Sequence, residues 1–195
     1  CKHIHLPVQS GNDRILGLMD RTYSRKDYLA FIEEIRRRRP GIALSTDIIC
    51  GFSSETDEEF NDTYRLVQDI GFHAAFVFKY SERKNTIAAR KYPDDVPEAV
   101  KVDRVNRLVD LAKGISLKRN RELIAQTVEV LIEGDSKRSA DQWMGKTNTF
   151  ITVVWDKAGS EVRPGNLVPV TIQRASVTTL FGAPAVQPAS GPSLR

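Results

Sequence analysis

The sequence predicts an α/β domain built on a parallel sheet, followed by a small all-β barrel. Two observations lead to this fold class. Between residues 3 and 124, a strand pattern alternates with a helix pattern three times, which is typical of βαβ units. After residue 125, short segments with apolar residues at every second position are separated by glycine and proline turn signals. Such a succession is typical of a small β-barrel.

The elements of the α/β part follow from apolar periodicity and from helix start signals. Ser24 is a good N-cap, and Thr56 with Glu59 three residues later forms the capping-box pattern. Gly71 is a helix stop signal. The expected elements are strands over residues 3–9, 42–49 and 73–80, and helices over residues 14–19, 25–38, 57–70 and 98–123.

The domain boundaries follow from changes in composition. We expect the α/β domain over residues 1–124, the barrel over 125–182, and a disordered tail over 183–195, where Pro, Ser, Gly and Ala dominate. Three strands are too few to close a parallel barrel, and the chain does not begin with methionine. We therefore expect a piece of a longer protein. The barrel strands are expected over residues 127–133, 149–155, 167–173 and 177–181.

Composition excludes several classes of protein. No apolar run approaches the ~20 residues that a membrane-spanning helix needs, so we expect no membrane partner. The two cysteines, Cys1 and Cys50, show neither a disulfide framework nor metal-ligand spacing, which favours a reducing, cytoplasmic location. Cys50 lies in an apolar strand and is expected to be a buried thiol. A net charge of +4 is compatible with an RNA partner without requiring one.

Polar residues follow each predicted strand of the α/β part. Ligand sites of parallel α/β sheets form at the carboxyl ends of the strands. This rule selects three clusters, which are residues 9–11, Asp47 with residues 51–55, and Lys79 to Ser81 with Arg83. Asp47 is expected to be a buried carboxylate, which needs a partner or a function.

Each cluster also has a purely structural interpretation, and the sequence leaves both open. Gln9 and Ser10 are ordinary turn residues, and Gly51 is an ordinary hinge. Tyr80 is equally compatible with the protein surface. His5 shares a strand face with His3, and we interpret it as a polar lining residue rather than as a metal ligand, because no third ligand is apparent.

Five stretches resemble the methylthiotransferase family of radical-SAM enzymes. The most specific is His-Leu-Pro-Val-Gln-Ser-Gly-Asn-Asp at residues 5–13, which is similar to the MiaB-type tRNA enzymes. The resemblance continues through residues 18–21, 45–52, 78–83 and 95–97 and covers about residues 1 to 182. It implies the last three βα units of a partial radical-SAM barrel, followed by an OB-like TRAM barrel that binds RNA.

The resemblance also implies a reaction, in which a methylthio group is added to isopentenyladenosine beside the tRNA anticodon. Its cofactors would be S-adenosyl-L-methionine and 4Fe-4S clusters, with an external electron donor. The cluster-binding cysteines of this family lie upstream of the stretches matched here, so we expect this chain alone to be free of clusters and inactive. No metal ligand is therefore assigned.

Residue roles follow only from the resemblance. The implied S-adenosylmethionine contacts are Gln9, Ser10, Asp47, Gly51 and Tyr80. Trp143 and Phe150 are candidates for base stacking, although Phe150 is equally compatible with the core. Basic residues expected to meet RNA phosphates are Lys118, Arg119, Lys137, Arg138, Lys146 and Arg174.

Two other functions remain open at this point. One is a methylthiotransferase that acts on a small-subunit ribosomal protein, and the other is a non-enzymatic RNA-binding module. In any of these cases the first strand of an incomplete parallel sheet exposes unpaired backbone groups. We therefore also expect the chain to self-associate through this edge.

Overall fold

The computed structural model describes residues 1–83, 85–157 and 162–185. It divides into two compact units, one over residues 2–116 and one that begins at Leu117. No helix among the described residues has the length and apolar character needed to cross a membrane.

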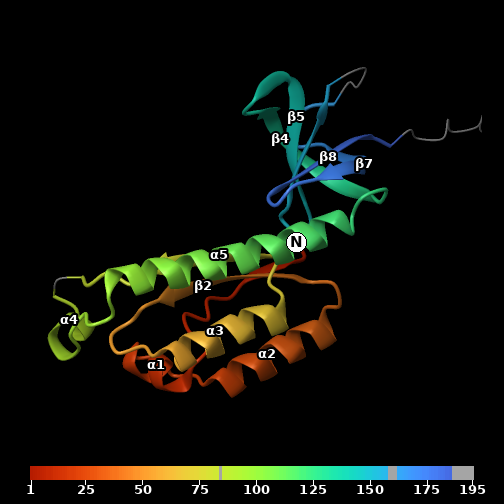
Figure 1. Ribbon diagram of the computed structural model, residues 1–195. Helices are drawn as coiled ribbons and strands as arrows, with labels where there is room; N and C mark the ends of the chain where they lie inside the picture. The colour runs from red at the N-terminus through yellow and green to blue at the C-terminus, as the bar shows by residue number, and fades with distance from the viewer. Residues whose placement is uncertain (84, 158–161, 186–195) are drawn as a thin grey trace, which may run out of the picture. The chain divides into compact units, whose positions relative to one another are not determined.

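The first unit has the predicted alternation of strands and helices. Its three strands form one parallel sheet in the order β1-β2-β3. Figure 1 shows α2 and α3 running side by side below the sheet. The elements are β1 (His3–His5), α1 (Asp13–Leu18), α2 (Arg25–Arg38), β2 (Ala43–Cys50), α3 (Asp57–Ile70), β3 (Ala74–Lys79), α4 (Ile87–Lys91) and α5 (Glu98–Arg121).

The helix boundaries agree with the local signals. Both capping boxes form, with the side chains of Ser24 and Thr56 accepting backbone N–H groups of the first turns of α2 and α3. Gly71 ends α3 with a φ of 62°, in the left-handed region that glycine tolerates. The helix α4 was not predicted, because its five residues are too few to show a periodic stripe.

The first strand is shorter than predicted. Regular pairing ends at His5, because Pro7 has no backbone N–H to donate. The chain nevertheless stays beside β2, since Leu6 N–H donates to the Ser45 carbonyl and Gln9 bridges to Ile48. Gln9 therefore lies at the end of the sheet, as its predicted role requires.

The two faces of the sheet differ in character. One face packs against α2, α3 and α5 through a buried apolar cluster that includes Leu44, Ile48 and Cys50. The other carries polar side chains of β1 and β2 together with Phe76 and Phe78, which are 53% and 52% exposed. Because Cys50 is buried among apolar groups, the prediction of a buried thiol is confirmed.

The second unit contains a closed five-stranded barrel in the order β4-β5-β6-β8-β7. Strand β5 was not predicted, because Gly145 occupies a core-facing position where an apolar side chain would signal a strand. A Cβ at Gly145 would lie 2.2 Å from the Leu131 carbonyl oxygen, so only glycine fits. The strands are β4 (Thr127–Ser136), β5 (Ser139–Thr147), β6 (Thr152–Asp156), β7 (Leu167–Ala175) and β8 (Thr179–Pro184).

The predicted tail overlaps the barrel. Strand β8 extends to Pro184 and pairs with β7 there, so the disordered tail does not begin at residue 183. The rest of that prediction, from residue 186, lies outside the described residues.

Strand β1 lies at one edge of the three-stranded sheet, as predicted. An unpaired parallel edge offers backbone groups to a neighbouring chain, so we expect concentration-dependent self-association. Sedimentation velocity over a range of protein concentrations measures this. A monomer at every concentration, with slow amide exchange in His3–His5, would contradict the prediction.

Candidate functional site

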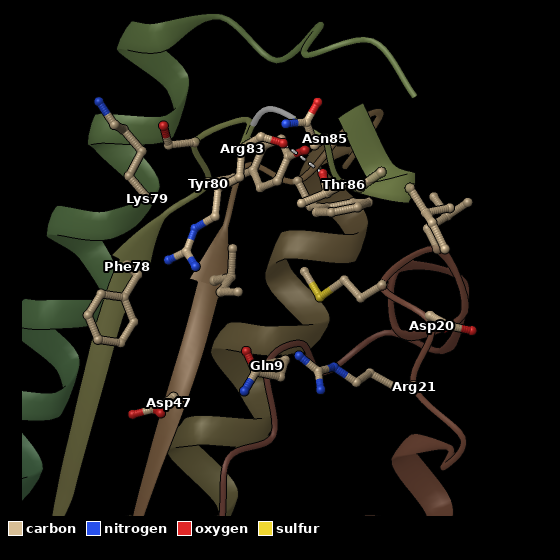
Figure 2. Close-up of a pocket in the computed structure, with 17 residues that line it drawn as sticks. Gln9, Asp20, Arg21, Asp47, Phe78, Lys79, Tyr80, Arg83, Asn85 and Thr86 are labelled. Atoms are coloured by element: carbon tan, nitrogen blue, oxygen red, sulfur yellow. Dashed lines mark hydrogen bonds between the residues drawn. The ribbon is translucent and has the colours of Figure 1, made fainter. Parts of the chain in front are cut away.

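A cavity of about 860 Å³ lies at the carboxyl ends of β2 and β3. Figure 2 shows Gln9, Arg21 and Asp47 at one end of it and Tyr80 with Asn85 at the other. Pockets of this size are typical of small-molecule and cofactor sites. Its lining comes from Gln9, residues 18–21, Asp47, Ile49, Phe52, residues 78–81, Arg83 and residues 85–88.

The structure brings together all three of the predicted clusters at this cavity. Gln9, Asp47 and Tyr80 line it, Gln9 from the segment after β1, Asp47 from within β2 and Tyr80 from the residue after β3. Gln9 is held there by its backbone, which donates to the Asp47 carbonyl and accepts from Ile49 N–H, both at 2.9 Å. The rule that ligand sites form at strand ends therefore selected residues that line this cavity.

Two of the predicted cofactor contacts have structural roles instead of lining the cavity. The Ser10 hydroxyl is fully buried, lies 3.3 Å from the Thr63 hydroxyl and accepts from Asn12 N–H. Gly51 has a φ of 71°, and a Cβ there would lie 2.4 Å from Cγ of Lys101. For both residues the structural interpretation accounts for the observed contacts.

Asp47 differs from its prediction in burial. Its side chain is 31% exposed, so it is not a buried carboxylate. The expectation failed because Asp47 points to the sheet face that does not carry the apolar core. The apolar residues that follow it in sequence gave no indication of this orientation. Its carboxylate lies 3.4 Å from Nε2 of His5.

Residues 18–21 carry part of the family resemblance, but no site role was predicted for them from the sequence. Residues 18–21 line the cavity, and Figure 2 shows the guanidinium of Arg21 pointing toward Gln9. Three lining residues that are not glycine have a left-handed backbone, namely Gln9, Asp20 and Asn85, with φ of 67°, 58° and 70°. Such strain is concentrated at functional sites, because the surrounding structure must stabilise it.

A buried ion pair between Glu55 and Arg104 stabilises the loop after β2. Glu55 accepts from Gly51 N–H at 2.7 Å and from Arg104 Nη1 at 2.9 Å, and both side chains are at most 4% exposed. Arg104 also donates to the carboxylate of Asp57, which is 79% exposed. Neither Arg104 nor Lys101 was selected from the sequence, because a basic residue in an amphipathic helix usually faces solvent.

The same loop carries an aromatic wall of the cavity. The rings of Phe52 and Tyr80 lie 4.6 Å apart, and the ammonium of Lys101 lies 5.4 Å from the Tyr80 ring. Lys101 is itself buried and forms an ion pair with Asp94. Partial burial raises the pKa of the Tyr80 hydroxyl, so at neutral pH Tyr80 is a neutral donor on the cavity wall.

No metal centre forms among the described residues, in which no group of three or more His, Cys, Asp or Glu side chains converges. Burial raises the pKa of the Cys50 thiol, which disfavours the thiolate that metals bind. The residues described here therefore do not fit an iron–sulfur cluster.

The second unit presents cations paired with aromatic rings. Lys146 lies 4.9 Å from the ring of Phe150, and Arg174 lies 3.7 Å from that of Phe181. Phe150 is 57% exposed, so the interpretation of this residue as part of the core is wrong. The Trp143 ring packs on the barrel core beneath Lys157, which makes it a less accessible stacking surface than Phe150.

The predicted RNA-contacting cations do not form one cluster. Lys137 and Arg138 are exposed at the tight turn between β4 and β5, whereas Lys146 lies near the other end of β5. Lys146 follows Arg138 by eight residues, and an extended strand of that length spans roughly 25 Å. Lys118 and Arg119 lie in the last turn of α5.

Two family models match the chain. Residues 1–67 match the radical SAM superfamily, and residues 121–184 match the TRAM domain. The second match covers the five-stranded barrel, and the first covers β1, β2 and most of α3.

Curated relatives match nearly the whole chain. A protein of Porphyromonas gingivalis named tRNA-2-methylthio-N(6)-dimethylallyladenosine synthase is 47% identical over 190 residues, which are 97% of this chain and 41% of the relative. A protein of Parabacteroides distasonis with the same name is 48% identical over 184 residues, 94% of this chain and 40% of the relative. The chain thus spans about two fifths of the length of these relatives.

A solved structure shows the fold. Coproporphyrinogen III oxidase (HemN) from Escherichia coli, a radical SAM enzyme, matches 75% of this chain and 41% of its own length, with a TM-score of 0.51 and 14% identity. At this identity the match supports the fold alone. Taken together, these comparisons show that the chain carries a radical SAM superfamily segment followed by a TRAM domain, and that it is homologous to the tRNA-2-methylthio-N(6)-dimethylallyladenosine synthases.

Proposed function

We propose that this chain provides one wall of the S-adenosylmethionine site and the RNA-binding domain of a tRNA methylthiotransferase. One observation carries the proposal. A cavity of cofactor size lies at the strand ends of the first unit, which includes the radical SAM match. The chain around it is 47% identical to synthases named for a methylthiolated tRNA adenosine. The names of these relatives favour tRNA over the ribosomal-protein alternative.

The cavity suits S-adenosylmethionine chemically. Asp47 and Gln9 offer hydrogen-bonding groups for a ribose or an amino-acid moiety, and Phe52, Tyr80 and Phe78 offer apolar surface for a purine. When bound, S-adenosylmethionine would supply the methyl group and the deoxyadenosyl radical that this class of reaction uses. The residues of this chain would bind it, orient it and exclude water from it.

Iron–sulfur clusters and the electron donor belong to the proposed enzyme as a whole. Because the described residues do not fit a cluster, we propose that other segments of the enzyme bind it. We also propose that the enzyme acts in the cytoplasm, where its tRNA substrate is found. After anaerobic reconstitution with iron and sulfide, this chain should retain no stoichiometric iron. Measured iron content together with the absorption spectrum tests this, and a full 4Fe-4S spectrum would contradict it.

Replacing Gln9 with alanine should weaken S-adenosylmethionine binding by roughly 1–3 kcal/mol, the free energy lost with a buried hydrogen bond. The positive φ of Gln9 is about equally unfavourable for alanine, so the backbone should contribute little to the difference. Isothermal titration of both proteins measures the effect. A matched control is Ser10→Ala, which alters the turn without removing a cavity-lining side chain. Equal affinities for wild type and Gln9→Ala would reduce Gln9 to a turn residue.

For the TRAM domain we propose a phosphate-binding role on tRNA. The supporting features are the exposed cations of the β4–β5 turn and the exposed ring of Phe150 beside Lys146. Its strand order, with a parallel pair between β6 and β8, supports the OB-like description. Small barrels of this kind bind single strands through cations and stacking rings.

A further inference from the structure

Four polar side chains form a continuous row on the sheet face opposite the apolar core. His3 and His5 come from β1, and Ser45 and Asp47 come from β2. Nε2 of His3 lies 3.0 Å from Oγ of Ser45, which in turn lies 2.8 Å from Nδ1 of His5. Nε2 of His5 lies 3.4 Å from the Asp47 carboxylate. The row ends at Asp47, which lines the cavity.

The chemistry of the four groups restricts where the protons lie. An ionised carboxylate only accepts hydrogen bonds, so Nε2 of His5 must carry a proton and donate it to Asp47. If His5 is neutral, its Nδ1 then has only a lone pair and accepts from the Ser45 hydroxyl. That hydroxyl has a single proton, so it accepts in turn from Nε2–H of His3.

Protonation of His5 reverses part of the row. Both ring nitrogens of His5 then donate, and the Ser45 hydroxyl can donate to Nε2 of His3 only if the proton of the neutral His3 ring has moved to Nδ1. The bond from His5 to Asp47 is the same in both states. The arrangement that the geometry excludes is a neutral His5 with its proton on Nδ1, because Nε2 would then present a lone pair to the carboxylate.

The surroundings support an ordered row. The His5 ring makes an edge contact with Phe76, with the ring centroids 6.0 Å apart, which restricts its rotation. Burial, and after it the charge of His5, lowers the pKa of His3, which keeps His3 neutral and able to donate or accept through one nitrogen.

We propose that His5 is a positioning residue, which holds the Asp47 carboxylate toward a hydrogen-bond donor of the ligand in the cavity, and that Ser45 and His3 in turn hold His5. The proposal rests on the proposed function, in which that ligand is S-adenosylmethionine. Two donors of such a ligand have the required chemistry, the ribose hydroxyls and the α-ammonium group. Both S-adenosylhomocysteine and methylthioadenosine carry the ribose, but only the first carries the ammonium.

The first test measures binding of S-adenosylmethionine, S-adenosylhomocysteine and methylthioadenosine to the 195-residue chain by NMR titration. His5→Phe keeps the ring and removes the donor, so affinity should fall about 3- to 10-fold, as expected for one lost hydrogen bond. His5→Gln supplies a new N–H and should recover most of it. Arg38→Gln, which changes a side chain that is 72% exposed on α2, should leave affinity within about twofold of wild type.

A double-mutant cycle separates positioning from a merely structural role. If His5 acts through Asp47, the combination His5→Phe with Asp47→Asn should bind no more weakly than Asp47→Asn alone. If the loss of affinity in the double variant equals the sum of the losses in the two single variants, the proposal is overturned. It is also overturned if Asp47→Asn weakens binding but His5→Phe does not. Methylthioadenosine affinity that falls in parallel assigns the ribose as the donor, and loss confined to the other two ligands assigns the ammonium.

A second test does not depend on any ligand. The ¹⁵N resonances of the His5 ring should show the proton of the neutral form on Nε2, and Ser45→Ala should shift the Nδ1 resonance. A neutral ring protonated on Nδ1, or an Nδ1 resonance unchanged in Ser45→Ala, would overturn the proposal. If the wild-type chain binds none of the three ligands, the proposed cofactor assignment fails, and the ring resonances still decide whether the row exists.

Discussion

Replacing Glu55 with alanine should lower the free energy of unfolding of the first unit by about 3–5 kcal/mol. The substitution leaves the Arg104 guanidinium buried without its one buried anionic partner among the described residues, and it leaves the Gly51 N–H without an acceptor. Burial raises the pKa of Glu55, whereas the hydrogen bonds from Gly51 and Arg104 act in the opposite direction. The guanidinium always carries its charge, and its hydrogen bond to Glu55 favours the ionised carboxylate.

The chain offers a matched control in Asp57, which accepts from the same guanidinium but is 79% exposed. Because solvent screens exposed ion pairs, Asp57→Ala should lower stability by less than about 1 kcal/mol. If both substitutions lowered the free energy of unfolding equally, burial of the Glu55–Arg104 pair would not explain the effect of Glu55→Ala.

The two units can be followed separately in this experiment. Both tryptophans, Trp143 and Trp155, lie in the second unit, whereas α1 to α4 lie wholly in the first. Urea unfolding followed by far-ultraviolet circular dichroism therefore reports mainly the first unit, and tryptophan fluorescence reports the second. Only the first transition should move to lower urea in Glu55→Ala. A shift confined to the fluorescence transition would contradict the assignment of the pair to the first unit.

Reversing Lys137 and Arg138 to glutamate should weaken tRNA binding by roughly 30-fold or more at 0.1 M salt. Each phosphate contact releases counterions and contributes about 0.7–0.9 to the slope of log affinity against log salt, so two lost contacts should reduce that slope by about 1.4–1.8. Both residues are exposed at the β4–β5 turn, so the reversal should leave the barrel core intact. Fluorescence anisotropy with labelled tRNA over a series of salt concentrations gives both quantities.

Arg37 and Arg38 of α2 provide the charge-matched control. They are exposed in the first unit and pair with Glu34. Reversing them changes the net charge equally, but affinity for tRNA should stay within about twofold of wild type. If tRNA binding is absent at low salt, or if the turn variant and this control lose affinity equally, the β4–β5 turn is not a phosphate contact.

The sequence by itself determined the order and type of most elements, because their signals are local. Capping boxes at Ser24 and Thr56, the stop at Gly71 and the alternation of apolar residues depend only on near neighbours in the chain. Where the local signal was weak, prediction failed. Strand β5 lacks an apolar residue at Gly145, and α4 is a single short turn of helix.

The region of the site was also predictable, since parallel strands bring their carboxyl ends to one edge whatever their sequence. Which residues at those ends face the cavity was decided by tertiary structure. Gln9, Asp47 and Tyr80 line it, whereas Ser10 turns toward Thr63, and Gly51 leaves room for Lys101.

Tertiary structure alone decided the contacts between residues that are distant in sequence. The Glu55–Arg104 pair joins positions 49 residues apart, and the row from His3 to Asp47 joins two strands through Ser45. The sequence indicated that His3 and His5 share a strand face and that Asp47 lies near a site, but nothing in it showed that Ser45 joins them or that Glu55 pairs with Arg104. Only the packing of α5 against the β2 loop, and the register of β1 beside β2, gives them hydrogen-bond partners and hence their proposed roles.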